Sequence, residues 1–251
     1  MASLLADPQG RGESLVEAAT LLRRADCELF DQLLTDALTP SEAGDIKAEQ
    51  AYHAKHKALL DLAPKGIVTV NVDDCHENFL QHRAPSWRVH DPVNDAEQKI
   101  LELAATLSKQ PFLIKAHGSL GRRVVFDYPA YRDLLEKSPG YNALMAHLFA
   151  HYQVLFIGFG LSDIDFDWLI DTTVRKFGSP LQPHVAVQLE EDGVDPIRLA
   201  AADAKAFRLA ERFGIHTVRV KAEGIQGLLE RASREPGQRL LRLIDDCKST
   251  D

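Results

Sequence analysis

The sequence predicts an α/β fold with a doubly wound, Rossmann-like parallel sheet, preceded by a helical N-terminal segment. Short apolar or β-branched runs alternate with longer helical patterns after residue 64, whereas the residues before it show helical spacing only. Strands separated by helices need crossover connections, which make the strands of one sheet parallel. The 251 residues, 45% of them hydrophobic, are enough for one main core.

The helical segment is expected over residues 13–63. Apolar residues recur at helical spacing from Leu15 to Leu34. The run Thr39-Pro40-Ser41-Glu42 is typical of a cap and first turn of a further helix. Pro64-Lys65-Gly66 then ends the segment, because proline and glycine interrupt helices.

The Rossmann-like core is expected over residues 64–222 and C-terminal helices over 223–248, so that 1–251 form a single domain. The predicted strands are 67–70, 111–116, 124–126, 153–157, 184–187 and 215–220. The predicted helices are 94–108, 129–151 with a break at Pro139-Gly140, 163–177, 196–213 and an amphipathic pair near 224–248. A loop is expected around Pro85, Trp87 and Pro92.

Composition excludes several classes of protein. The net charge of -8 and the pI of 5.7 argue against a general nucleic-acid binder, in which Lys and Arg normally outnumber the acids. The three cysteines, at positions 27, 75 and 247, form no Cys-x-x-Cys pair, so neither a disulfide framework nor a metal cluster is indicated. No apolar run is long enough for a membrane span, and no signal peptide is evident. We therefore expect a cytoplasmic protein.

Polar or glycine residues follow three of the predicted strands, where open α/β sheets bind their ligands. The three segments are Asn71-Val-Asp-Asp74, His117-Gly-Ser119 and Gly158-Phe-Gly160. A histidine in this place can exchange a proton near neutral pH. Glycines there let a ligand approach the backbone. The pattern predicts one site at this edge of the sheet.

Each of these positions also has a purely structural interpretation. Asp73 is well placed to cap the helix that follows it. His117-Gly118 is also consistent with a plain turn, and Gly158 and Gly160 with a tight strand-to-helix connection. Both interpretations stay open, because capping and turn formation are compatible with ligand binding.

The helix predicted after Gly160 begins with three acidic residues. Asp163, Asp165 and Asp167 favour the dipole at that helix end, but their charge would repel a phosphate. A sugar or base is therefore expected there, rather than a pyrophosphate.

Four sequence elements in this order resemble the sirtuin-like NAD-binding domains of bacterial defence proteins. They are Ile67-Val-Thr-Val-Asn-Val-Asp73, Lys115-Ala-His-Gly-Ser119, Val124-Val-Phe126 with Tyr131, and Leu155-Phe-Ile-Gly-Phe-Gly-Leu-Ser-Asp-Ile-Asp165. The likeness extends to Ala210–His216 and covers roughly residues 45–235.

The resemblance implies a site for NAD, used as substrate, and no metal. Asn71 would orient water or the nicotinamide ribose, and His117 would be the base on a ribose hydroxyl or on the attacking water. The further residues implied in cofactor binding are Thr69, Asp73, Gly118, Gly158, Gly160 and Leu161. The usual outcome in this family is cleavage of NAD+ to nicotinamide and ADP-ribose, and defence members thereby consume cellular NAD to stop phage growth. A base and a polar amide can assist such an oxocarbenium-like transition state.

The sequence also departs from the family pattern. Family members begin with a strand and a Gly-Ala-Gly-x-Ser loop that binds the pyrophosphate through backbone N–H groups. Gly10 and Gly12 follow no strand, so we expect this N-terminal strand and loop to be missing. Val70 and Val72 replace a Thr and a Tyr that are common in the motif, and Gly160 stands where a Ser often contributes a hydroxyl.

Three functions follow as alternatives. The first is an NAD+ glycohydrolase in antiphage defence. The second is a degenerate, noncatalytic sirtuin-like interaction or regulatory module, and the third is an NAD-dependent protein deacylase, many of which carry a four-cysteine zinc module that three cysteines cannot form. The expected partners are NAD+ and either a second copy of the chain or a partner defence protein, with no membrane and no direct nucleic-acid binding.

Overall fold

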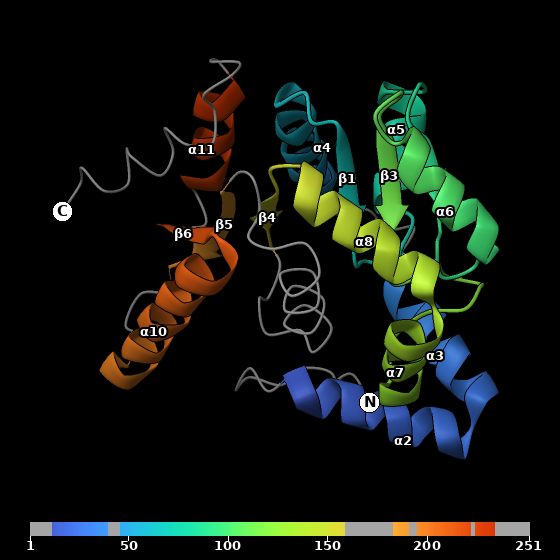
Figure 1. The fold of residues 1–251 in the computed structure, drawn as a ribbon. Helices are drawn as coiled ribbons and strands as arrows, with labels where there is room; N and C mark the ends of the chain where they lie inside the picture. The colour runs from blue at the N-terminus through green and yellow to red at the C-terminus, as the bar shows by residue number, and fades with distance from the viewer. Residues whose placement is uncertain (1–11, 40–45, 159–182, 191–194, 222–223, 234–251) are drawn as a thin grey trace. The chain divides into compact units, whose positions relative to one another are not determined.

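The computed structural model of residues 1–251 describes residues 12–39, 46–158, 183–190, 195–221 and 224–233 (Figure 1). The chain divides into two compact units. The first unit comprises Met1–His53 and Pro64–Leu144, and the second comprises Ala54–Ala63 and Met145–Asp251. Each unit holds its own three-stranded parallel sheet, which confirms the predicted α/β class with parallel strands. That the two units form one domain stays a prediction.

Helices occupy the N-terminal part of the chain, as the apolar spacing predicts. They are α2 (Gly12–Ala25), α3 (Cys27–Leu38) and α4 (Ile46–Asp61). Asp26 caps α3, because its side chain accepts a hydrogen bond from the Leu29 N–H at 2.9 Å. Arg23 of α2 forms an ion pair at 2.5 Å with the buried Asp127, which itself caps helix α7 (Tyr128–Lys137). Helix α2 is thereby attached to the rest of the first unit.

The sheet of the first unit has the order β1-β3-β2. Its strands are β1 (Gly66–Thr69), β2 (Arg88–His90) and β3 (Phe112–Lys115), and both outer strands run parallel to β3. Every residue of β3 is buried, as expected for a central strand with both faces covered. The helices that connect these strands and follow them are α5 (Cys75–Arg83), α6 (Glu97–Thr106), α7 and α8 (Pro139–His151).

Two sequence predictions in this unit are wrong. The loop expected around Trp87 contains β2, which escapes a periodicity argument because Arg88-Val-His90 is only three residues long with one apolar member. The strand expected at Val124–Phe126 is reduced to a single antiparallel bridge between Val124 and Gly118. The β-branched valines there instead pack in the core, where both are almost fully buried.

The second unit is built on a sheet of order β4-β5-β6. Its strands are β4 (Leu155–Ile157), β5 (His184–Leu189) and β6 (Ile215–Val220), and its later helices are α10 (Pro196–Phe213) and α11 (Gly224–Ser233). Both ends of α10 agree with prediction: Asp195 accepts from the Ile197 N–H, and Gly214 ends the helix in the left-handed conformation with φ of 63°. The predicted helix 163–177, the cap at 40–42 and the helix beyond residue 233 lie outside the described residues.

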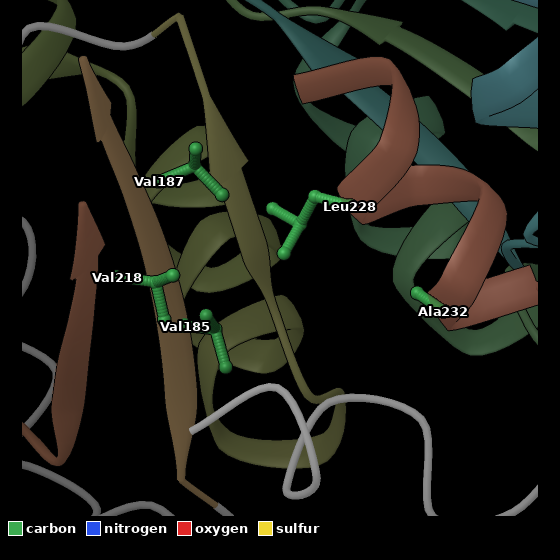
Figure 2. Packing of buried hydrophobic residues seen from close by; sticks show 5 residues of the cluster. All are labelled: Val185, Val187, Val218, Leu228 and Ala232. Atoms are coloured by element: carbon green, nitrogen blue, oxygen red, sulfur yellow. The ribbon is translucent and has the colours of Figure 1, made fainter. Parts of the chain in front are cut away.

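The core of the second unit joins its sheet to α11. Five buried side chains, Val185, Val187, Val218, Leu228 and Ala232, form one cluster. Figure 2 shows Leu228 extending from α11 toward the valines of the sheet. Burial of such aliphatic groups contributes about 1.5–3 kcal/mol for each large side chain. Within the described part of the chain, no helix is long and apolar enough to cross a membrane.

His184 is a buried titratable group within this second unit and is only 2% exposed. Its Nδ1 accepts a hydrogen bond from the Val154 N–H at 3.1 Å, so the ring binds in its neutral form. The rings of Phe149 and Phe156 pack edge-on against it. Burial lowers the pKa of His184 to about 4, although a hydrogen bond with the backbone of Phe149 opposes this shift.

The buried His184 predicts a stability that falls in mild acid. In the unfolded chain this histidine titrates near pH 6.5, so between pH 6.5 and 4 the unfolded state binds the additional proton. The free energy of unfolding, measured with urea, should fall by about 2 kcal/mol between pH 7 and pH 4.5 through this group alone. His184→Gln should flatten that decrease, whereas the exposed His151→Gln should leave it intact. An unchanged slope in His184→Gln would assign the acid sensitivity to other groups.

Candidate functional site

The carboxyl ends of β1 and β3 meet at one edge of the first unit's sheet. Thr69 pairs in register with Lys115, and the Ala116 N–H donates to the Thr69 carbonyl at 2.8 Å. Asn71 and His117 each stand two residues beyond this paired position. The backbone pairing therefore brings the two predicted catalytic residues to the same sheet edge.

Thr69 shapes the turn that carries Asn71. The threonine is 7% exposed, and its Oγ1 accepts a hydrogen bond from the backbone N–H of Asn71 at 3.1 Å. The hydroxyl thus serves the local backbone turn, as short polar side chains do at strand ends. Asn71 itself is exposed, so its side-chain amide faces solvent at this edge.

Asp73 adopts the capping role that the sequence left open. Its Oδ1 accepts a hydrogen bond from the Cys75 N–H at 2.9 Å, at the first residue of α5. Asp74, the residue directly before the helix, makes no such side-chain bond. The carboxylate of Asp73 therefore satisfies one of the otherwise unpaired N–H groups of the helix start.

Lys115, at the end of β3, is fully buried and was not singled out from the sequence. Its Nζ donates to the Val72 carbonyl at 3.3 Å and to the Asp73 carbonyl, and it forms an ion pair at 2.5 Å with Glu77 of α5. Both carbonyls belong to the loop that follows Asn71. The only sequence signal is a lysine inside an apolar strand, where a buried ammonium needs several acceptors.

His117 lies beside Tyr131 of α7 and is 5% exposed. The two rings meet edge to face, with centroids 5.3 Å apart and planes at 88°. The His117 carbonyl accepts a hydrogen bond from the Val125 N–H at 2.9 Å. Backbone and ring contacts together fix the histidine at the sheet edge.

Gly118 has no permissible substitute in this turn. Its φ is +84°, a region that side chains rarely adopt, and a Cβ atom there would lie 2.2 Å from the Arg123 carbonyl oxygen. The turn interpretation of His117-Gly118 is therefore correct, and it leaves the site interpretation untouched.

A third strand end adds an acidic residue that the sequence did not single out. Asp91 directly follows β2, whose pairing with β3 ends one residue earlier at His90. It is 8% exposed, and its Oδ2 accepts a hydrogen bond from Ser119 Oγ at 2.9 Å. No sequence signal indicates that Asp91 is buried, because Asp91-Pro92 lies in a segment that the sequence predicts to be a loop.

The remaining predicted residues belong to the second unit. Gly158 directly follows β4, is exposed and has a φ of +64°, so the backbone conformation favours glycine there. Gly160, Leu161 and the aspartates at 163, 165 and 167 lie outside the described residues. That this strand end joins the edge formed by β1 and β3 stays a prediction. Among the residues that the structure describes, no group of three or more His, Cys, Asp or Glu could hold a metal ion.

The contacts of Lys115 predict a large loss of stability on its neutralisation. Lys115→Met leaves two carbonyls and the Glu77 carboxylate without their donor, so the free energy of unfolding should fall by about 3 kcal/mol. The double variant Lys115→Met/Glu77→Leu should lose less than the sum of the single variants, because the unpaired charge is removed. Lys99→Met is the control, since the Lys99 side chain is 62% exposed and its ion pair with Asp95 should be worth about 0.5 kcal/mol. Urea unfolding gives the free energy of unfolding of these variants. If Lys115→Met loses as little stability as Lys99→Met, the contacts of Lys115 do not stabilise the fold as predicted.

Comparisons with known proteins agree with this architecture. The family model of the SIR2-like domain matches residues 65–215, which include the strands β1 to β5 and end at the first residue of β6. Defense-associated sirtuin 2 of Bacillus subtilis is 22% identical over 177 residues, covering 63% of this chain. The matched region is 17% of the length of that relative, so the chain corresponds to a small part of it. By the extent of the family match, and as the sequence resemblance predicts, the chain belongs to the SIR2-like domain family.

Proposed function

We propose that this chain is an NAD+ glycohydrolase, which cleaves NAD+ to nicotinamide and ADP-ribose. SIR2-like domains use NAD as substrate, which sets the substrate class. The observation that carries the proposal is the pairing of β1 with β3, which puts Asn71 and His117 at one strand-end edge. This is where α/β sheets bind ligands.

Hydrolysis of NAD+ requires from the protein a group that orients the reactants and a group that accepts a proton. The bond between ribose C1′ and the nicotinamide nitrogen breaks, its electron pair stays on nicotinamide, and water adds to C1′. His117 accepts the proton that this water releases, and the Asn71 side chain orients the water or the ribose. Positioned bases of this kind contribute about 10²–10⁴-fold in rate. The 5% exposure of His117 limits competition from bulk water.

Other residues of this edge support the same assignment. The exposed Asn71 is accessible to a ligand, while the Thr69 side chain accepts from the Asn71 N–H and the Asp73 side chain caps the helix that follows. Gly118 is proposed to contribute its backbone to the cofactor contacts, in the tight turn that only a glycine permits. Gly158, Gly160 and Leu161 are proposed to complete the cofactor contacts.

The biological setting we propose is antiphage defence. The support is the relative named a defense-associated sirtuin, whose name concerns that protein alone. The match covers only 17% of that relative. We also propose that a second copy or a partner defence protein, present in the cytoplasm, cooperates with this chain.

Nicotinamide release from NAD+ tests this function directly. The chain should release nicotinamide in a chromatographic assay, and His117→Ala and Asn71→Ala should each lower the rate by about 100-fold or more. His82→Ala, an exposed histidine on α5, should retain the wild-type rate.

Two alternative results would replace the proposal. Absence of nicotinamide release from a folded sample, together with no NAD+ binding in calorimetry, would favour the noncatalytic module. Nicotinamide release that requires an acyl-lysine peptide would instead identify a deacylase.

A further inference from the structure

Asp91 contacts the segment that carries His117. Its buried Oδ2 accepts hydrogen bonds from Ser119 Oγ at 2.9 Å and from Asn94 Nδ2 at 2.8 Å. Ser119 stands two residues after His117, in the turn that leaves β3. The end of β2 thereby holds the first limb of this turn directly.

Asn94 extends the contact of Asp91 to the second limb of the turn. Its Nδ2 donates to the Arg123 carbonyl at 3.0 Å, and its Oδ1 accepts from the Arg123 N–H at 3.1 Å. One side chain thus satisfies both backbone groups of Arg123, as a neighbouring strand would. Two residues later, the Val125 N–H donates to the His117 carbonyl. The turn 117–125 is consequently held on both sides from one carboxylate.

The energetic setting of Asp91 differs from that of the other buried charges in the first unit. Asp127 is paired with Arg23, and Lys115 with Glu77. In the described part of the chain, Asp91 has no cationic partner, and its Oδ1 is buried without a hydrogen-bond partner. A buried carboxylate oxygen without a partner costs stability, whereas the two hydrogen bonds that Asp91 accepts hold the turn, so these contacts point to a role in geometry.

We propose that Asp91 is a positioning residue for His117, acting through Ser119 and through Asn94. It keeps the turn 117–125 closed, so that the His117 ring stays against Tyr131 at the sheet edge. The catalytic consequence rests on the proposed NAD+ hydrolysis, whereas the structural consequence is independent of it. Asp91 touches neither the proposed base nor the reacting atoms in this role.

The experiment uses the full chain with Asp91→Ala, Asp91→Asn and the control Asp95→Ala. Asp95 is an acid of the same loop, but its carboxylate binds Lys99 of α6. The first measurement is amide hydrogen exchange at Arg123 and Val125. The second is the NMR shift of the His117 ring protons, which report the adjacent Tyr131 ring.

Asp91→Ala should raise the exchange rate at both amides about tenfold or more, because the local opening equilibrium of the turn shifts by the same factor. The His117 ring signals should move toward the values of an unstacked histidine. Asp91→Asn keeps an acceptor for Ser119 Oγ and should restore part of both signals, which also protects the test if Asp91→Ala folds poorly. Asp95→Ala should match wild type.

Turnover adds a readout of positioning. The kcat for nicotinamide release should fall about tenfold in Asp91→Ala with KM within about twofold, because the proton acceptor is displaced rather than the ligand contacts. Unchanged exchange in Asp91→Ala, or an equal increase at the β1 and β3 amides, would overturn the proposal. An unchanged kcat alongside faster exchange would overturn the catalytic consequence. If wild type releases no nicotinamide, the proposed function fails, and exchange and NMR still decide the role of Asp91.

Discussion

The parallel pairing of β3 with both of its neighbours is the constraint on which the first unit depends. Because β3 is central and entirely buried, its register with β1 and with β2 fixes where each of the three strands ends at the edge of the sheet. Asn71, Asp91 and His117 follow these three strands, so backbone hydrogen bonding alone gathers them. A slip of one residue in either pairing would turn the side chains of that strand to the opposite face of the sheet, and the residues after the strands would no longer come together.

Buried charge at this edge is handled in two ways. Lys115 receives a full set of acceptors, namely two carbonyls and the Glu77 carboxylate, and so links β3 to the loop after Asn71. Asp91 receives neutral donors only and retains a buried oxygen without a partner among the described residues. The acceptors around Lys115 compensate the desolvation of its ammonium group, whereas the donors around Asp91 compensate the desolvation of its carboxylate only in part. Stability therefore explains the lysine far better than it explains the aspartate.

The sequence predicts the elements whose apolar spacing is long enough to be unambiguous. Helix 196–213 and strand 215–220 agree residue for residue with α10 and β6, because Asp195-Pro196 and Gly214 mark the helix ends. Three-residue β2 carries no periodic signal, and Val124–Phe126 has strand composition without a partner strand beyond one bridge. The division of the strands into two sheets depends on contacts between distant segments, which local patterns do not encode.

The positions of site residues can likewise be predicted where a local pattern is sufficient, but not where contacts between distant segments decide. Residues shortly after a strand, such as Asn71, can be located from sequence because position along the chain determines their edge. The burial of Asp91 and Lys115 cannot, because composition assigns charged residues to the surface unless their partners are known. Two of these partners, Ser119 and Glu77, come from other segments of the fold, whereas Asn94 belongs to the same loop as Asp91.

At His117-Gly118 the structure shows the turn, and this turn is compatible with the proposed site. A glycine is required because the backbone has a φ of +84° and the Arg123 carbonyl lies where a Cβ would be. That same close approach allows Val125 to bond the His117 carbonyl and Asn94 to bond Arg123. A larger residue at 118 would open the turn and release the histidine with it. The tight turn is thus the means by which a histidine at a strand end keeps a defined position, which any role as a proton acceptor demands.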